Sequence, residues 1–175
     1  EAVAFLDFLV ETGQTLWQVL PLGPTGYGDS PYQCLSAFAG NPLLIDLEAL
    51  GEIGLLDGAD LKAGEDLPRR EVDFGALIEY KTPLLAKAHA AFETDGPPES
   101  HRALAEFRVA QASWLSDYAL YAALKGAHRG RPWYEWEPGL ARRDPSALAR
   151  ARRDLARDVQ RVEFEQWLFF SQWGR

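Results

Sequence analysis

One loop of the sequence carries the residue types that bind or react with a substrate. Between Gly23 and Gln33 the chain reads Gly-Pro-Thr-Gly-Tyr-Gly-Asp-Ser-Pro-Tyr-Gln, so carboxylate, hydroxyl and amide groups lie beside two aromatic rings. Sugars need both kinds of partner, because their hydroxyls form hydrogen bonds and their C–H faces stack on rings. The alternative is a purely structural loop in which the tyrosines serve as packing. The candidate sugar-binding residues are Tyr27, Asp29, Ser30, Tyr32 and Gln33.

The elements that must position this loop precede it in the chain. The apolar residues between Ala4 and Leu9 recur at helical spacing, and Gly13 follows where a helix C-cap is expected. The run Leu16–Leu20 is short, β-branched and aromatic and is ended by Pro21, which predicts a buried strand. A helix, a turn and a strand are half of a parallel α/β unit, in which loops at the carboxyl ends of strands build the site.

After the loop the sequence becomes mainly helical. Residues Asn41–Asp46 predict a turn and a short extended piece, followed by a helix with Leu47, Leu50 and Ile53 inside. A further helix from Asp73 is expected to be interrupted or kinked at Pro83. Residues 99–128 predict one long helix or two abutting helices, and 133–136 a turn.

The last helix is predicted to begin at the N-cap pair Asp144-Pro145. Its end, Trp167–Phe170, is aromatic around most of its circumference and therefore needs cover on several sides. One strand and a set of helices do not supply that cover. We therefore expect an α/β protein with further sheet, although these residues are themselves mostly α-helical.

Other candidate sites carry weaker signals, and no cofactor or metal is predicted. The glycines of the loop are too irregularly spaced for a dinucleotide fingerprint, and no Gly-Lys-Ser/Thr follows them. Cys34 is interpreted as a small buried thiol, because the sequence shows no base that would activate it. The histidines lack partners at ligand spacing and are interpreted as surface or cap residues: His89, His101 and His128.

Charge argues against nucleic acid as a partner. The formal net charge is −8, whereas binding to phosphates needs a basic surface. The arginines between Arg142 and Arg161 alternate with Asp144, Asp154 and Asp158, which indicates a solvated helix face. The negative net charge favours a neutral ligand over a polyanionic one.

Cysteine usage and hydropathy point to a cytosolic protein. The single cysteine excludes an intrachain disulfide, and no apolar run is long enough to span a membrane. No signal peptide opens the chain. The sequence contains no Met and begins inside a helical pattern, so we expect it to be part of a longer protein.

The residues from Trp17 to Gln33, Trp-Gln-Val-Leu-Pro-Leu-Gly-Pro-Thr-Gly-Tyr-Gly-Asp-Ser-Pro-Tyr-Gln, resemble the signature of glycoside hydrolase family 77, the amylomaltases. Ser36–Pro42 continues the match, and residues 117–125 and 166–174 resemble the same family. The resemblance implies a (β/α)8 barrel with a large helical insertion. It also implies a 4-α-glucanotransferase that moves α-1,4-glucan segments between chains by a retaining mechanism.

The resemblance carries further expectations for this segment. The family's nucleophile and general acid/base belong to motifs outside these 175 residues, so the segment alone is expected to be inactive. Tyr32 resembles the tyrosine that stacks on the sugar beside the scissile bond, with Ser30 and Gln33 as its neighbours. Tyr27 resembles an aromatic that contacts glucan outside the catalytic centre. Ile78 is aliphatic where family members can carry an aromatic, which disfavours a secondary glucan site built on it.

Three parts of the chain are expected from this resemblance. Residues 1–45 supply a barrel helix, a strand and the site loop, 46–140 a mainly helical insertion, and 141–175 a long helix that leads back. The expected partners are an α-1,4-glucan such as a maltooligosaccharide and the rest of the chain's own barrel. The alternatives are a non-catalytic carbohydrate-binding module on Tyr27 and Tyr32, or a helical interaction domain.

Overall fold

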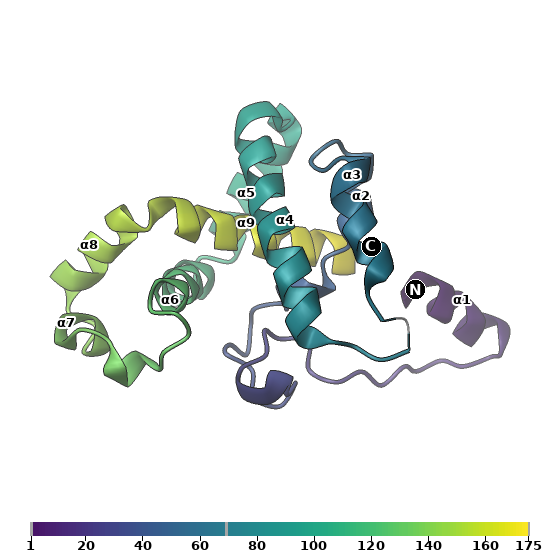
Figure 1. Cartoon of the computed structure of the whole chain (residues 1–175), viewed down its shortest axis with the longest axis horizontal. Helices are drawn as coiled ribbons and strands as arrows, with labels where there is room; N and C mark the ends of the chain where they lie inside the picture. Colours follow the sequence, from purple (N-terminus) through teal and green to yellow (C-terminus); the bar gives the residue numbers. More distant parts are fainter. Residues whose placement is uncertain (1, 69, 175) are drawn as a thin grey trace.

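The computed structural model describes residues 2–68 and 70–174, and over these ranges the chain is built of helices joined by loops (Figure 1). Their order along the chain matches the helical pattern of the sequence. The α-helices are α1 (Ala2–Glu11), α2 (Leu47–Glu52), α3 (Gly58–Lys62), α4 (Phe74–Asp95), α5 (Pro98–Ala110), α6 (Leu115–Ala127), α7 (Pro138–Ala141), α8 (Pro145–Asp154) and α9 (Ala156–Trp173). Short 3-10 helices are η1 (Tyr27–Asp29), η2 (Pro42–Leu44), η3 (Ala63–Asp66) and η4 (Trp133–Glu135).

The predicted strand Leu16–Leu20 does not form within the described residues. In the described residues the only β contact is one antiparallel bridge, between Thr25 and Cys34. The segment that follows α1 runs as an open stretch of chain below the helices in Figure 1, and Leu16 is 89% exposed. A strand exists only when a neighbouring strand pairs with its backbone groups, and these residues have no such neighbour. The expectation that these residues are themselves mostly α-helical is confirmed, and the wider α/β architecture stays a prediction.

Helix α1 ends as the sequence predicts. Gly13 has φ +74°, its N–H donates to the Val10 carbonyl at 3.0 Å, and the Gln14 N–H donates to the Leu9 carbonyl at 2.8 Å. This pair of bonds is the Schellman motif, which needs a left-handed residue such as glycine. The helix itself buries no residue, so its apolar face lies open: Phe8 is 53% exposed and Val10 75%.

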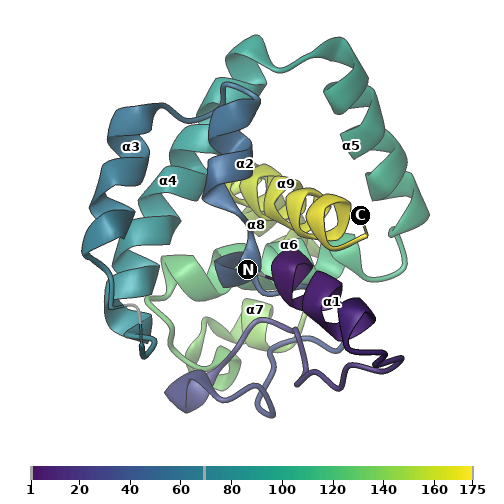
Figure 2. The same ribbon diagram turned by 90° about the vertical axis from the view of Figure 1, so that its right-hand side faces the viewer.

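Helix α9 lies at the centre of the molecule, with α2, α4, α5 and α6 around it (Figure 2). Its first half contributes Val159 and Val162 to a core formed with α6, α8 and Trp136. Its second half contributes Phe164, Leu168 and Phe169 to a separate core formed with α2, α4 and α5. One helix therefore holds two hydrophobic cores together.

Helix boundaries differ from the expected ones at two places, Pro83 and Leu155. Pro83 does not interrupt α4. A proline leaves the carbonyl four residues earlier, here that of Glu79, without a helical hydrogen bond, and both residues face solvent. Residues 99–128 form two helices, α5 and α6, joined by a turn at Gln111–Trp114, which is one of the two expected arrangements. The last helix begins at Pro145 as expected but breaks at Leu155, where φ is −108° and ψ 23°.

One expectation about burial is also corrected. Ile53 is 58% exposed, because α2 ends at Glu52 and turns away from the core. The turn and short extended piece expected at 41–46 are confirmed: η2 forms the turn, capped by the Asn41 side chain, which accepts from the Leu43 N–H at 3.0 Å, and Ile45 and Asp46 are extended. No helix within the described ranges has the length and apolar character required to cross a bilayer.

The histidines divide into three environments. His128 caps the end of α6: its ring nitrogens lie 2.8 Å from the Leu124 carbonyl and 2.9 Å from the Glu137 carboxylate, which confirms a cap role. His101 is exposed. His89 is 4% exposed and packs on the ring of Phe164, so the interpretation of His89 as a surface residue is wrong.

The buried His89 predicts a pH dependence of stability. Burial lowers its pKa, with nearby arginines acting in the same direction and Glu93 opposing. Below about pH 6.5 the unfolded chain binds a proton at His89 more readily than the folded chain does. The free energy of unfolding therefore decreases as the pH falls below about 6.5. We expect His89→Leu to flatten the decline in unfolding free energy below about pH 6.5, measured by urea unfolding at several pH values. An unchanged slope in the variant would contradict this account.

Candidate functional site

The loop from Gly23 to Gln33 is closed at its base by the Thr25–Cys34 bridge. The Leu35 N–H donates to the Pro24 carbonyl at 2.9 Å, which extends the closure by one bond. Gly26 sits where an added Cβ would lie 2.7 Å from the Gln33 carbonyl oxygen, so only glycine fits there. The prediction of an irregular loop at this position is confirmed.

The tip of the loop presents Tyr32 to solvent. Its side chain is 73% exposed, and the Ser30 hydroxyl accepts a hydrogen bond from the Tyr32 N–H at 3.3 Å. Asp29 is half-buried and has φ +53°, and Gln33 is exposed. The Tyr27 side chain lies outside the described part of the structure. Of the predicted residues, Tyr32 alone is a described lining residue of the adjacent pocket, with Ser30 supporting its backbone.

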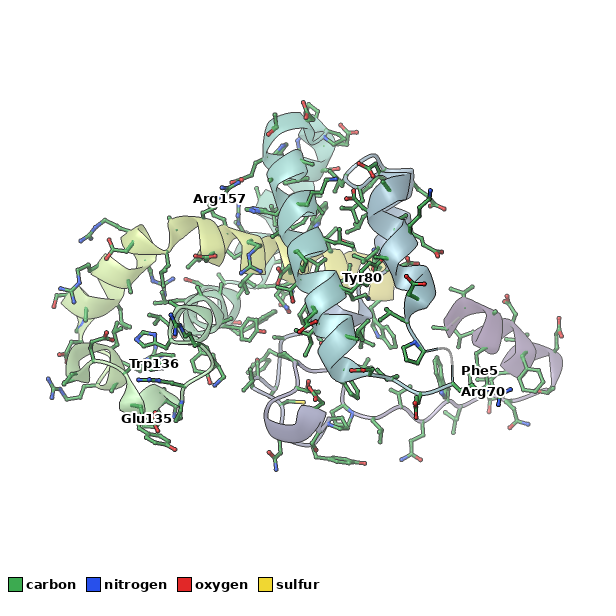
Figure 3. All side chains as sticks on the ribbon, viewed as in Figure 1. Phe5, Arg70, Tyr80, Glu135, Trp136 and Arg157 are labelled. Atoms are coloured by element: carbon green, nitrogen blue, oxygen red, sulfur yellow. The ribbon has the colours of Figure 1, made fainter. Side chains whose placement is uncertain are left out.

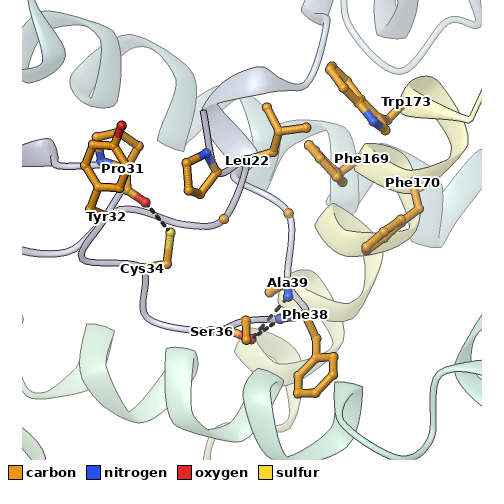
Figure 4. Close-up of a pocket in the computed structure, with 14 residues that line it drawn as sticks. Leu22, Pro31, Tyr32, Cys34, Ser36, Phe38, Ala39, Phe169, Phe170 and Trp173 are labelled. Carbon is orange, nitrogen blue, oxygen red and sulfur yellow. Dashed lines mark hydrogen bonds between the residues drawn. The ribbon is translucent and has the colours of Figure 1, made fainter. Parts of the chain in front are cut away.

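That pocket has a volume of about 500 Å³ and lies between the loop and the end of α9. Figure 4 shows Pro31 and Tyr32 on one side and Phe169, Phe170 and Trp173 on the other. Phe170 is 37% exposed and Trp173 46%, so both offer ring surface to a ligand. The geometry is an open, aromatic-walled hollow of the size that small ligands occupy.

The floor of the pocket is fixed by short local bonds. The Ser36 hydroxyl accepts from the Phe38 and Ala39 N–H groups, both at 3.1 Å. The Cys34 thiol donates to the Pro31 carbonyl at 2.9 Å and is half-buried, less enclosed than the expected buried thiol. Phe38 stacks on Trp114 of the α5–α6 turn, with ring centroids 6.3 Å apart and planes 18° apart, which continues the aromatic wall.

Two glutamines of α9 hold the segment that follows the loop. Gln166 is buried, accepts from the Gly40 N–H at 2.8 Å and donates to the Gly40 carbonyl at 2.9 Å. Gln172 makes the same pair of bonds with the backbone of Asp46, at 2.7 Å and 3.1 Å. Each glutamine amide thus bonds both the N–H and the carbonyl of one residue, Gly40 or Asp46, as a neighbouring β-strand would.

A lysine from α4 completes this support. The Lys81 ammonium donates to the carbonyls of Leu43 and Ile45, both at 2.6 Å. Burial lowers the pKa of Lys81 to about 8, and the nearby carboxylate of Asp46 opposes that shift. The segment 40–46 is therefore held from two helices, α4 and α9.

The site has no cluster of metal-ligating groups. Across residues 2–68 and 70–174, no group of three or more His, Cys, Asp or Glu side chains could hold a metal ion. The lining of this pocket offers stacking on rings and hydrogen bonding to backbone and hydroxyl groups.

The model of one protein family, described as 4-alpha-glucanotransferase (glycoside hydrolase family 77), matches residues 1–175. The chain belongs to this family. It is 52% identical over 174 residues to the 4-alpha-glucanotransferase of Thermus thermophilus and 43% identical over 172 residues to that of Synechocystis. These matches cover 99% and 98% of the chain but 34% of each relative.

A solved structure gives the same result for the fold. The amylomaltase from Streptococcus agalactiae, in complex with acarbose, superposes on 99% of this chain with a TM-score of 0.87 at 35% identity. The chain covers 35% of that protein. This segment of a 4-alpha-glucanotransferase-family protein therefore spans about a third of the length of the relatives that it matches.

Sequence reasoning missed the part of the site that α9 supplies. Phe169, Phe170 and Trp173 lie more than a hundred positions from the loop in the sequence, and no local pattern joins the two. A signal was nevertheless present, since the aromatic end of the last helix required cover. The loop of this 4-alpha-glucanotransferase-family chain provides part of that cover.

Proposed function

We propose that this chain is part of a 4-α-glucanotransferase that transfers α-1,4-glucan segments to an acceptor sugar. The family match over the whole chain and the names of its relatives support this activity. In the retaining mechanism a carboxylate attacks the anomeric carbon, a second acid protonates the leaving oxygen, and the acceptor hydroxyl resolves the covalent intermediate. We place those two carboxylates outside these 175 residues.

The role of this segment is to bind glucan. The observation that carries this proposal is the 500 Å³ pocket in which exposed Tyr32 faces aromatic residues of α9. A pyranose ring stacks on the face of Tyr32, and its hydroxyls bond to polar groups of the loop. Asp29, Ser30 and Gln33 are the neighbouring polar groups, and Tyr27 contacts glucan further from the reacting bond.

The rest of a (β/α)8 barrel is the proposed cover for the N-terminal segment. Helix α1 buries none of its residues, and the apolar side chains of 16–20 are also exposed. Pairing of residues 16–20 with a neighbouring barrel strand would remove these side chains from water. On this proposal 1–45 belongs to the barrel, 46–140 is a helical insertion and 141–175 leads back to the barrel.

The activity proposal makes a direct prediction for the isolated chain. Since transfer requires two carboxylates that we place elsewhere, the pure 175-residue chain is expected to release no glucose from maltotriose above a blank without protein. The measurement is an enzyme-coupled glucose assay with a full-length relative as the positive control. Glucose release in proportion to the concentration of the pure chain would overturn the proposal that the catalytic carboxylates lie outside these 175 residues.

Tyr32 provides the test of binding. Loss of a stacking ring removes about 0.5–1.5 kcal/mol, so Tyr32→Ala is expected to weaken maltotriose binding about twofold to tenfold in calorimetry. Tyr32→Phe keeps the ring and should bind nearly as the wild type. Since Tyr32 is exposed, neither variant should change the melting temperature appreciably. Equal affinities for all three proteins would show that Tyr32 does not stack on the sugar.

A further inference from the structure

A second pocket, of about 330 Å³, lies between α6, η4, α7 and α8, and it shares no lining residue with the first. It is built within the second hydrophobic core, where helices on both sides are held by buried contacts. Its lining combines three aromatic rings, an ion pair and aliphatic side chains. The rings belong to Tyr121, Trp133 and Trp136, and the charges to Asp117 and Arg143.

The floor of this pocket is rigid. Trp136 is 7% exposed, its indole N–H donates to the Arg131 carbonyl at 3.2 Å, and it stacks on His128 with ring centroids 5.0 Å apart. Tyr121 lies against the same indole at 5.7 Å. Figure 3 labels Trp136 in the turn between α6 and α7. A ligand therefore meets a preformed surface and orders little on binding.

The wall of the pocket is an open indole. Trp133 follows Pro132, begins η4 and is 53% exposed, although it lines the pocket. Tyr134 meets it edge to face at 5.8 Å, which restricts the ring without covering all of it. An exposed tryptophan that lines a preformed hollow is the arrangement on which the C–H face of a sugar ring stacks.

The rim carries charged groups that match sugar hydroxyls. Asp117 accepts from Arg143 at 2.8 Å and from Arg152 at 3.1 Å. The Asp117 side chain is 59% exposed and that of Arg143 65%, so both keep contact with water. A carboxylate has about four acceptor positions and a guanidinium five donors, which is more than one ion pair uses.

These features favour a sugar over an apolar side chain of a protein partner. A protein partner that seals the hollow would strip water from the Asp117–Arg143 pair, and such desolvation is costly. A sugar hydroxyl replaces that water with a hydrogen bond to the same charged groups. The volume, near the lower limit of about 300–1,000 Å³ for ligand sites, suits a short saccharide.

We propose that this pocket is a second saccharide site, with a pyranose ring stacked on Trp133 and its hydroxyls bonded to Asp117 and Arg143. The choice of an α-1,4-glucan as the saccharide rests on the proposed function. The pocket chemistry itself requires only a pyranose. The second pocket shares no residue with the pocket of Tyr32. A glucan chain can therefore bind here independently of stacking on Tyr32.

The test is a titration of the ¹⁵N-labelled chain with maltotriose, followed through the indole N–H signals of its tryptophans. We expect the Trp133 and Trp136 signals to shift and saturate. Trp133→Ala should weaken this binding about tenfold and Asp117→Asn about fivefold. Tyr32→Ala, a matched aromatic truncation in the first pocket, should leave the Trp136 shift unchanged. Mannitol, a polyol without a ring, should cause no shift.

Each outcome decides between the two sites. If maltotriose perturbs only residues of the first pocket, the second site is wrong and the proposed function stands. If the Trp136 shift survives Tyr32→Ala and requires about tenfold more maltotriose in Trp133→Ala, the second site is supported whatever Tyr32 does. Equal shifts with mannitol would overturn recognition of a pyranose. Should Trp133→Ala fail to fold, the wild-type titration and Asp117→Asn still decide.

Discussion

Gly40→Ala is expected to lower the free energy of unfolding by about 3 kcal/mol, at the upper end of the cost of overpacking a core. An added Cβ would lie 2.0–2.3 Å from three ring atoms of Phe169, which is itself 5% exposed. The backbone would have to shift, and the shift would lengthen both bonds from Gly40 to Gln166. The change thus acts on packing and hydrogen bonding together.

Urea unfolding followed by circular dichroism measures this effect, and α6 supplies a matched control. Gly126 is exposed in a helix, and a Cβ there would meet nothing within 4 Å. Gly126→Ala is therefore expected to stabilise the chain by about 0.5 kcal/mol, since alanine favours the helix over glycine. Equal effects of the two substitutions would contradict the close approach of Gly40 to α9.

The second large effect is expected at Gln166. Methionine has a similar length and no hydrogen-bonding groups of comparable strength, so Gln166→Met leaves the Gly40 N–H and carbonyl unpaired in a buried place. A buried unsatisfied polar group costs about 1–3 kcal/mol, so the two groups together should cost about 2–6 kcal/mol. We also expect weaker maltotriose binding, because the wall formed by Phe38 and Phe169 would loosen.

Gln160→Met on the same helix is the control for this substitution. Gln160 is exposed, so its replacement should change the unfolding free energy by less than about 0.5 kcal/mol. If Gln166→Met were as mild as Gln160→Met, water would have to replace the lost amide, and the segment 40–46 would not depend on α9 in the way that we describe.

Local patterns predicted most of the helices in this chain. Caps and periodicity are properties of neighbouring residues, so the Gly13 C-cap, the start of α8 at Pro145 and the Gly-rich loop were all accessible from the sequence. The break at Leu155 was not, because the apolar residues Leu148, Leu155, Val162 and Phe169 recur every seven positions through it. The spacing of apolar residues does not predict the backbone angles of a single residue such as Leu155.

The failures share a physical cause, which is dependence on distant residues. The run Leu16–Leu20 has strand-forming side chains, but a strand also needs a partner, and none of the described residues supplies one. Likewise, Tyr32 was identified from its loop, whereas Phe169 and Trp173 reach the same pocket only through the fold. His89 was misjudged because its burial depends on how α4 packs against α9.

The link between Gly40 and Gln166 also sets an order of events during synthesis of the chain. The two residues are 126 positions apart, so at about 5–20 residues per second a ribosome adds Gln166 some 6–25 s after Gly40. Until then the backbone of Gly40 bonds to water, and the loop of Tyr32 has no aromatic wall opposite it. The loop of Tyr32 therefore gains the aromatic wall opposite it only well after the loop itself has been synthesised.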